Sequence, residues 1–186
     1  MLATVFIDGE AGTTGLQIYD RLKDRHDIRL LHLADSERKD PKRRREILNE
    51  ADLAILCLPD DAAREAVSMI GNGNTRVIDA STAYRVDSDW VYGMPEYDSG
   101  QTARIAAAMR VSNPGCYPIA AIGMLNPLVQ AGLVPTDWPI TINAISGYSG
   151  GGKQLIAAFE DTESADYTQT PFSVYALGLE HKHVLE

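Results

Sequence analysis

The feature that most constrains the fold is a short apolar run that leads directly into a glycine-rich loop near the start of the chain. Residues 3–7 (ATVFI) predict a buried strand, residues 9–15 (GEAGTTG) a turn, and residues 16–22 a helix. Glycines in such a unit let the backbone approach a pyrophosphate, and the helix N-terminus supplies N–H donors. The loop therefore predicts nucleotide binding, with a tight structural turn as the alternative because the spacing is not GxGxxG. The candidate binding residues are Gly9, Gly12, Thr13, Thr14 and Gly15.

The alternation of strand and helix continues through residue 82. Apolar runs at 28–34, 53–59 and 76–82 predict further strands, and helix-like segments begin at Pro41 and Asp60. Buried strands that alternate with helices indicate a parallel sheet covered by helices. We therefore expect the α/β class, with a parallel sheet as the first structural unit.

The pattern changes after residue 115. One apolar helix is predicted over 117–131, and the letters TINAI then have strand character and run into a glycine-rich segment. We expect residues 1–115 to form a dinucleotide-binding domain and residues 116–186 to form the N-terminal part of a second domain. That second part is short for an independent core. The chain also stops in mid-pattern at HKHVLE, so we expect it to be the front part of a longer protein.

Composition and charge argue against several functional classes. The chain has 186 residues and a formal net charge of −9, which disfavours a nucleic-acid partner because phosphate neutralisation requires a basic face. No apolar run approaches the roughly 18 residues of a membrane span, so no membrane partner is expected. The N-terminal letters MLATVFIDGEAG lack a basic leader and predict no signal peptide. Cys57 and Cys116 lie in unlike contexts and do not indicate a disulfide scaffold, so a reducing cytoplasm is the expected compartment.

The segment Ser112-Asn113-Pro114-Gly115-Cys116-Tyr117-Pro118 supplies the strongest candidate for chemistry. Cys116 follows a Pro-Gly turn at the entrance of an apolar helix, where unpaired N–H groups and the positive end of the helix dipole favour the thiolate. Beside a nucleotide loop, such a cysteine suggests covalent chemistry coupled to hydride transfer. The alternative is a small buried core residue, which is what most free cysteines are.

Cofactor choice is expected to depend on residues after the second strand. Asp35 is placed where an acid can bind the ribose 2′-hydroxyl of NAD. Ser36, Arg38 and Lys39 follow at once and could instead hold a 2′-phosphate, which favours NADP narrowly. The basic run that continues through Arg45 is interpreted as a solvated helix face.

Two further loops are candidates for ligand contact. Residues 79–85 (DASTAYR) end a predicted strand, where open parallel sheets collect ligands; Ser81 is a candidate cofactor contact, and Arg85 could hold a phosphate or carboxylate. Residues 146–153 (SGYSGGGK) offer backbone N–H groups and an ammonium to an anion, and a flexible surface turn explains these glycines equally well.

Two histidines near the end of the chain are the candidates for a general acid or base. A catalytic thiolate needs such a partner close in space, and His181 and His183 are placed to supply it, whereas His26 and His32 belong to the first unit. The i,i+2 spacing of His181 and His183 also fits a pair of metal ligands. No cysteine or carboxylate set completes such a site, so no metal is expected.

Taken together, these motifs resemble the N-acetyl-gamma-glutamyl-phosphate reductase family, in particular its shorter type, which is related to aspartate-semialdehyde dehydrogenase. The resemblance extends along the whole chain and is carried by an ordered set of segments: GEAGTTG at 9–15, DASTAYR at 79–85, YGMPE at 92–96, SNPGCYP at 112–118, SGYSGGG at 146–152 and HKH at 181–183.

The resemblance implies a Rossmann domain followed by a mixed α/β catalytic domain, in a protein that forms homo-oligomers. It implies that Cys116 is the nucleophile and His181 the acid/base, with His183 as the competing candidate. The longer type of the family often has a proline where this chain has Leu185. The implied substrate-site residues are Asn113, Arg85, Ser146, Gly147, Tyr175 and Glu186.

The implied reaction is the NADPH-dependent reduction of N-acetyl-gamma-glutamyl phosphate to N-acetylglutamate 5-semialdehyde and phosphate, through a cysteine thioester, in arginine biosynthesis. The acyl phosphate is the expected partner. Two alternatives stay open: another semialdehyde dehydrogenase, such as one that acts on aspartyl phosphate, and a dinucleotide-binding regulator without catalysis. None of the residues identifies what would recognise the acetyl group.

Overall fold

The computed structural model describes residues 2–174, 176–178 and 180–186. Its centre is a six-stranded, all-parallel sheet with the strand order β2-β1-β3-β4-β6-β5. The predicted α/β class with a parallel sheet is therefore confirmed. The strands are β1 (Ala3–Asp8), β2 (Ile28–Leu31), β3 (Leu53–Leu56), β4 (Arg76–Asp79), β5 (Val91–Tyr92) and β6 (Arg110–Ser112).

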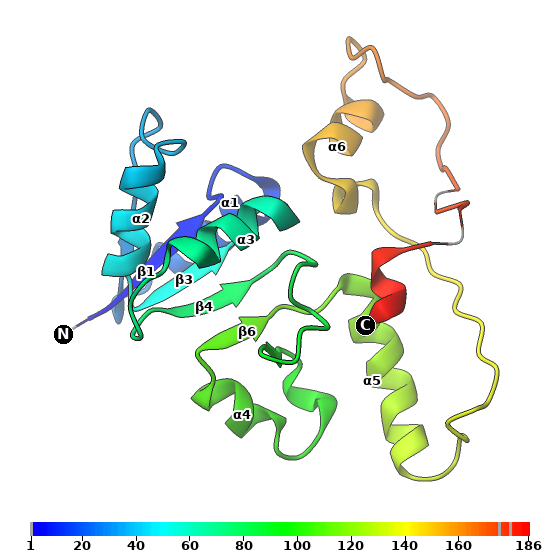
Figure 1. Cartoon of the computed structure of the whole chain (residues 1–186). Helices are drawn as coiled ribbons and strands as arrows, with labels where there is room; N and C mark the ends of the chain where they lie inside the picture. The colour runs from blue at the N-terminus through cyan, green and yellow to red at the C-terminus, as the bar shows by residue number, and fades with distance from the viewer. Residues whose placement is uncertain (1, 175, 179) are drawn as a thin grey trace.

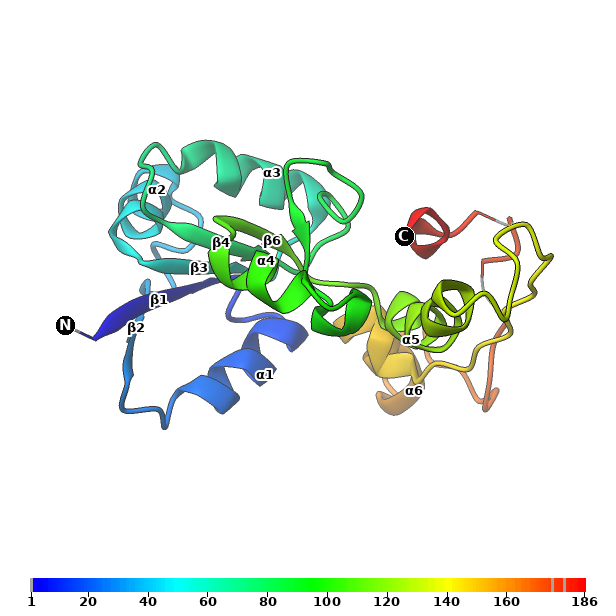
Figure 2. The same cartoon turned by 90° about the horizontal axis from the view of Figure 1, so that it is seen from below.

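Helices cover both faces of this sheet. In Figure 2, α1 (Thr13–Leu22) lies on one face, and α2 (Pro41–Glu50) and α3 (Asp60–Met69) lie on the other. Between α2, α3 and the sheet lies the main apolar core, in which Leu48 and Leu56 are fully buried. The short α4 (Gln101–Ala107) connects β5 to β6. The fold is thus a three-layer arrangement, in which helices on the two faces of the sheet connect its parallel strands.

Local sequence signals explain where these helices begin. Pro41 is the first residue of α2, and the Asp40 carboxylate before it accepts a hydrogen bond from the Lys42 N–H at 2.8 Å. A proline with fixed φ and an acidic cap both favour a helix start at this point. No side chain caps α5 (Cys116–Gln130), whose N-cap is Gly115, so its first N–H groups face the surroundings without a capping oxygen.

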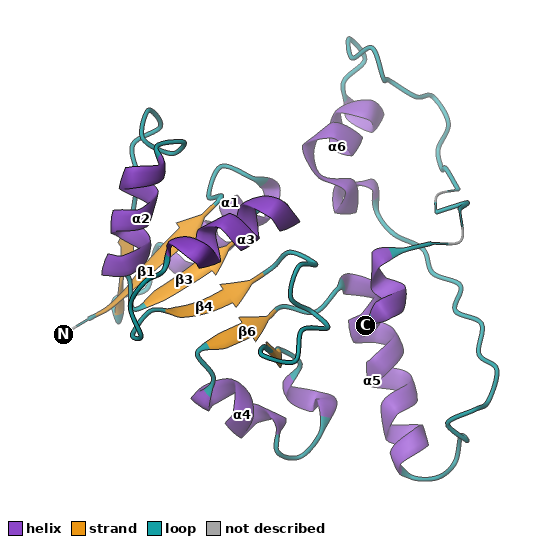
Figure 3. Ribbon diagram, viewed as in Figure 1, coloured by secondary structure: helices purple, strands orange, loops and turns teal. Residues whose placement is uncertain are grey.

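Beyond residue 115 the chain adds helices but no strand among the described residues. Figure 3 shows α5 and α6 (Gly152–Glu160) joined by long loops. The 3₁₀ helix η2 (Tyr148–Gly151) precedes α6, and η3 (Lys182–Leu185) lies beside the start of α5 in Figure 1.

Several elements differ from the sequence-based expectation. The predicted strands at 28–34, 53–59 and 76–82 end at Leu31, Leu56 and Asp79, because the chain turns into loops at the sheet edge. The run TINAI, predicted to have strand character, lies in the loop between α5 and η2, and no strand pairing is formed there. The sequence pattern also missed β5, β6 and the 3₁₀ helix η1 (Pro95–Tyr97), which are each two or three residues long.

In the part of the chain that the structure describes, no helix is long and apolar enough to cross a membrane.

Candidate active site

The carboxyl ends of the parallel strands bring the predicted motifs to one edge of the sheet. The glycine-rich loop follows β1, residues 79–85 follow β4, and the cysteine segment follows β6. The Asn113 N–H donates to the Asp79 carbonyl at 2.7 Å and so ties the last two loops together. This edge, next to the point where the strand order reverses between β1 and β3, is where open α/β sheets bind ligands.

The glycine-rich loop is a tight cradle in which side chains would not fit. A Cβ at Gly9, where φ is +90°, would collide with the Cys57 carbonyl, and one at Gly15 would collide with the Gly9 carbonyl. Gly12 is the N-cap of α1, and its own N–H donates to the Gly9 carbonyl at 2.9 Å. Thr13 and Thr14 form the first turn of α1, where free N–H groups and the helix dipole suit a pyrophosphate. The loop therefore fits a dinucleotide.

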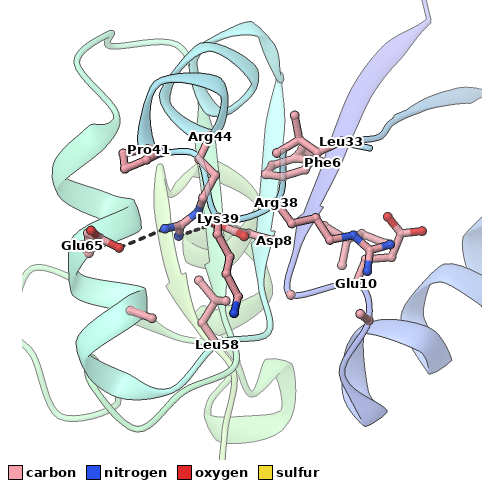
Figure 4. A pocket seen from close by; sticks show the side chains of 14 residues that line it. Phe6, Asp8, Glu10, Leu33, Arg38, Lys39, Pro41, Arg44, Leu58 and Glu65 are labelled. Atoms are coloured by element: carbon pink, nitrogen blue, oxygen red, sulfur yellow. Dashed lines mark hydrogen bonds and ion pairs between the residues drawn. The ribbon is translucent and has the colours of Figure 1, made fainter. Parts of the chain in front are cut away.

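A cavity of about 400 Å³ continues from this loop between α2, α3 and the end of β1. Figure 4 shows Arg38 and Lys39 extending over it, with Leu33 and Leu58 on its walls. Arg38 also pairs with Asp35 at 2.7 Å, so the acidic residue predicted to bind the ribose of NAD is held by a cation. Ser36 is exposed and is not part of the cavity lining. Two cations next to apolar walls suit an adenosine 2′-phosphate, because the cations can bind the phosphate and the apolar side chains can pack against the adenine.

The floor of this cavity contains a partly buried ion network, centred on a residue of the basic run predicted to be a solvated helix face. The Arg44 guanidinium donates to Asp8 and to Glu65, both at 2.9 Å, and its side chain is only 10% exposed. Arg44 belongs to the basic run of α2, but its position turns it inward toward the end of β1. A helical period places one residue of such a run on the buried face, which is the signal that could have identified it.

The second glycine-rich segment reaches back to the first. Lys153 donates through Nζ to the Ala11 carbonyl at 2.8 Å, which places the beginning of α6 at the nucleotide loop. The sequence left the choice between an anion site and a flexible turn open for this segment. The structure supplies the long-range contact, across 142 positions of the chain, that connects it to the nucleotide loop.

Cys116 is exposed at the first position of α5, directly after β6 and the turn 113–115. The other cysteine, Cys57, lies at the end of β3, where burial, with Asp79 and Asp8 nearby, raises the pKa of its thiol to about 11. The two thiols therefore differ in access and in environment. Cys116 has the setting that a reactive cysteine requires.

A carboxylate from the end of the chain binds the residue before the nucleophile. Glu186 accepts from the Gly115 N–H at 2.8 Å, from Arg85 Nη1 at 2.7 Å and from the Tyr92 hydroxyl at 3.0 Å. The side chains of Glu186 and Arg85 are 1% and 9% exposed. We call Arg85, Tyr92, Gly115 and Glu186 the carboxylate cluster. Because Glu186 is buried and accepts these three hydrogen bonds, it fixes the turn that precedes Cys116.

His183 packs against the same turn. A Cβ on Gly115 would lie 2.7 Å from His183 Nε2 and 2.6 Å from Glu186 Oε1, so a larger residue here would displace these two side chains. His181 and His183 each make an edge contact with the Tyr117 ring. The His181 Nδ1 accepts the backbone N–H of His183 at 3.2 Å. Burial, opposed in part by Glu186, lowers the pKa of His183 from its ordinary value of 6.5.

Tyr92 and Asp79 are site residues that the sequence analysis did not assign. Tyr92 belongs to the YGMPE motif, and burial together with its hydrogen bond to Glu186 raises its pKa. Asp79 is fully buried, and desolvation raises the pKa of its carboxyl, which accepts the Ser81 hydroxyl at 2.6 Å. Ser81 therefore directs its hydroxyl to Asp79. The position of both motifs at strand ends was the available signal.

The remaining predicted substrate residues make local contacts in this structure. Asn113 is exposed and its Nδ2 donates to the Pro114 carbonyl at 3.3 Å. Ser146 donates to the Gly147 carbonyl at 3.2 Å, at the start of η2. Tyr175 lies outside the described residues. Arg85 is inside the site, but its Nη groups are taken by Glu186 and by the Ala80 carbonyl.

Comparison with known proteins places this architecture in a family. Residues 4–105 match the family described as semialdehyde dehydrogenase, NAD binding domain, and residues 116–186 match the one described as semialdehyde dehydrogenase, dimerisation domain. Among solved structures, aspartate semialdehyde dehydrogenase II from Vibrio cholerae aligns with a TM-score of 0.60 at 17% identity, over 85% of this chain and 50% of that one. The enzyme from Francisella tularensis aligns with a TM-score of 0.61 at 18% identity, over 84% and 48%. At these identities the likeness shows the fold.

Curated relatives are much closer in sequence. The chain is 60% identical to N-acetyl-gamma-glutamyl-phosphate reductase of Burkholderia cenocepacia over 98% of this chain and 58% of that protein. It is 55% identical to the protein of the same name from Sinorhizobium fredii over 100% of this chain and 61% of that protein. The chain thus spans about 58–61% of the length of these relatives.

Proposed function

The chain belongs to the semialdehyde dehydrogenase family, and from that premise we propose that it is an NADPH-dependent N-acetyl-gamma-glutamyl-phosphate reductase of arginine biosynthesis. The observation that carries the proposal is an exposed Cys116 at an uncapped helix N-terminus, with two histidines against the neighbouring Tyr117 ring, in a chain that is 60% identical to a relative of that name. The products are N-acetylglutamate 5-semialdehyde and phosphate.

In the first stage, the Cys116 thiolate attacks the γ-carbonyl carbon of the acyl phosphate. A carbon–sulfur bond forms, the bond from carbon to the phosphate oxygen breaks, and phosphate leaves with that electron pair. Covalent capture holds the acyl group at the sheet edge, where the nucleotide loop also lies. The Gly115 N–H is occupied by Glu186, so the Cys116 N–H and the Asn113 side chain are the proposed donors to the oxyanion.

In the second stage, the nicotinamide, when bound, supplies the hydride that reduces the thioester carbonyl. The chain's own part is to release the aldehyde: the carbonyl re-forms, the carbon–sulfur bond breaks, and the Cys116 sulfur leaves with that electron pair. His181 in its imidazolium form is the proposed acid that protonates the departing sulfur. His183 has a lowered pKa and packs on Gly115, which supports a positioning role for it, although it stays the competing acid/base candidate.

We assign NADP as the cofactor on the residues that would hold it. Gly9, Gly12 and the first turn of α1 would receive the pyrophosphate, and Arg38 and Lys39 would hold the 2′-phosphate over the cavity floor. The Asp35–Arg38 ion pair supports this preference, because it compensates the acid that would otherwise bind the ribose hydroxyls of NAD.

We also propose that the protein is a cytoplasmic homo-oligomer. The match of residues 116–186 to a dimerisation domain supports self-association. A reducing compartment keeps the exposed Cys116 thiol available for catalysis. A domain boundary near residue 115 is part of the same proposal, since the nucleophile would then begin the second domain.

The test is phosphate-dependent reduction of NADP by the complete encoded protein, with N-acetylglutamate semialdehyde and aspartate semialdehyde in parallel. We expect turnover of the acetylated substrate and none of aspartate semialdehyde. Turnover of aspartate semialdehyde would keep the cysteine chemistry and change the substrate. A protein that binds NADPH and turns over neither substrate would be a dinucleotide-binding regulator.

A further inference from the structure

One charged side chain of α2 lies at a position where a helix usually carries an apolar residue. The residues that α2 buries are Arg44, Ile47 and Leu48, with the i, i+3, i+4 spacing of a core-facing stripe. Their neighbours Arg43 and Arg45 are exposed. Burial of a guanidinium costs desolvation, and a buried ion pair is often no more stabilising than apolar residues of similar size. The stability of the fold therefore does not by itself explain an arginine at position 44.

Arg44 links two carboxylates from different elements. Its Nη2 donates to Asp8, the last residue of β1, and its Nη1 donates to Glu65 of α3, both at 2.9 Å (Figure 4). The side chains of Arg44 and Asp8 are 10% and 8% exposed, whereas that of Glu65 is 54% exposed. The ion pair with Asp8 is thus shielded from water, and the one with Glu65 is not. Loss of Arg44 would leave the charge of Asp8 uncompensated at a place where solvent and salt screen it poorly.

The Asp8 carboxylate belongs to the proposed dinucleotide site. Asp8 directly precedes Gly9 of the glycine-rich loop, and both residues line the cavity of about 400 Å³. Arg38 and Lys39, which we assign to the 2′-phosphate of NADP, line the same cavity. An uncompensated carboxylate at this place would therefore repel the phosphates of the cofactor.

The charged side chains around this cavity balance one another. Three carboxylates and three cations line it: Asp8, Glu10, Glu65, Arg38, Lys39 and Arg44. Arg44 pairs with two of these carboxylates, and the third, Glu10, contacts His32 Nδ1 at 3.1 Å. Lys39 forms no ion pair with the described residues, so its charge is available to a phosphate. Removal of Arg44 would give the lining a net negative charge, which disfavours an anionic ligand.

We propose that Arg44 is a positioning residue of the cofactor site, which neutralises Asp8 and thereby allows the cavity to bind the 2′-phosphate of NADP. The proposal rests on the proposed function only through the identity of the cofactor. Arg44 acts through Asp8 and needs no contact with the ligand, because a weakly screened charge acts across the cavity. NADPH and NADH share the pyrophosphate, so the ratio of their Kd values isolates the effect on the 2′-phosphate.

The test measures the Kd of NADPH and of NADH by fluorescence titration of the complete encoded protein. Arg44→Met keeps a side chain of similar length without the charge, and Arg45→Met makes the same change at an exposed position of the same helix. In Arg44→Met we expect the Kd of NADPH to rise about 30-fold and that of NADH about 3-fold, so that their ratio rises about 10-fold. In Arg45→Met both Kd values should stay at those of the wild type.

A second substitution separates charge compensation from packing. Asp8→Asn removes the charge that Arg44 compensates, so the double variant Arg44→Met/Asp8→Asn should return the NADPH-to-NADH Kd ratio to within about 3-fold of the wild-type value. A loss of packing alone would not be repaired by a change at Asp8. A wild-type ratio in folded Arg44→Met, or a raised ratio that Asp8→Asn does not restore, would overturn the proposal.

Asp8→Asn alone covers the case in which Arg44→Met does not fold. Arg44 then keeps one carboxylate partner instead of two, so the NADPH-to-NADH Kd ratio should fall about 3-fold, toward tighter binding of NADPH. An unchanged or raised ratio in the folded Asp8→Asn protein would overturn this proposal and leave the proposed function standing. A wild-type protein that binds neither dinucleotide would overturn both. The expected Kd ratios in a protein without turnover would overturn the proposed function alone.

Discussion

The two parts of this chain, before and after residue 113, are held together by different kinds of interaction. Among the described residues, the buried apolar side chains lie before residue 112, with Pro114, Pro118 and Ala158 as the exceptions. In the later part, large apolar side chains are exposed, among them Leu133 at 72% and Trp138 at 63%. The first part is built around a core between sheet and helices, whereas the second has none of comparable size among the described residues.

The later part joins the first through polar contacts at three places. These are the carboxylate cluster, the hydrogen bond from Lys153 to the Ala11 carbonyl, and the Tyr97 carbonyl, which accepts from Asn126 and Gln130. The first two are at the carboxyl edge of the sheet, so the proposed chemistry lies where the two parts meet. A parallel sheet provides a rigid edge, and polar contacts of defined geometry place the later segments on it.

The largest effect is expected from the junction itself. Cys116→Ser removes the proposed nucleophile and should lower kcat on the order of 10³-fold or more, with NADPH affinity nearly unchanged, because the nucleotide loop belongs to the first part. Steady-state kinetics and NADPH titration measure both quantities. Retained turnover would remove Cys116 from the mechanism.

Cys57→Ser is the matched control for this variant. Cys57 is in the first part, and its thiol pKa is raised to about 11, so the Cys57→Ser variant should keep kcat and KM close to the wild-type values. In the wild type, the Cys57 thiol should resist alkylation at about pH 8, whereas the exposed Cys116 thiol should be labelled. Comparable labelling of the two thiols would contradict the difference in environment.

The next largest effect is expected from a change in the carboxylate cluster. Glu186→Gln leaves the buried Arg85 cation without its counter-charge, and breaking a buried pair in this way costs about 3–5 kcal/mol. We expect kcat/KM to fall on the order of 10²-fold and a protease to cut the segment before Glu186 faster, with little loss of NADPH binding. Glu180→Gln changes the same type of residue at an exposed position and should leave these properties unchanged. Equal kcat/KM and equal cleavage rates in the two variants would show that the carboxylate cluster does not hold the C-terminal segment on the sheet edge.

A smaller effect should appear when the first part is altered. Gly15→Ala places a Cβ against the Gly9 carbonyl and the Glu10 Cα, so the loop must shift and the NADPH Kd should rise about 10-fold. Gly73→Ala has no heavy atom within 4 Å of the new Cβ and should bind NADPH as the wild type does. Fluorescence titration gives both Kd values, and a normal Kd for Gly15→Ala would contradict the cradle.

The smallest effect is expected from a change of pH. Burial lowers the pKa of His183 when the segment that carries it is docked on Gly115, so between the lowered pKa and 6.5 the undocked segment binds a proton that the docked one does not. The free energy that favours docking is therefore largest above about pH 6.5 and decreases as the pH falls below it. Hydrogen exchange of the Gly115 amide, which Glu186 protects, should be faster relative to an unaffected β1 amide at about pH 5.5 than at about pH 7.5. His183→Asn should remove the difference, and an unchanged profile in that variant would exclude His183 as its source.

The sequence pattern predicted those features that depend on local signals. The strand–glycine–helix unit at 3–22, the proline start of α2 and the placement of Cys116 at a helix entrance each depend on neighbours within a few positions. Short strands such as β5 were missed because two residues carry no periodicity. Arg44 was misread because a basic run hides the one position that faces inward.

By itself, the sequence determined the α/β class, the glycine-rich turn between β1 and α1 and the placement of a cysteine at the start of α5. Tertiary structure alone decided that Glu186 would join Arg85, Tyr92 and Gly115, which lie 101, 94 and 71 positions away. It also decided that Lys153 would reach Ala11. The physical reason is that a carboxylate or an ammonium has many possible partners along the chain, and the fold selects the pair by fixing which loops share the carboxyl edge of the sheet.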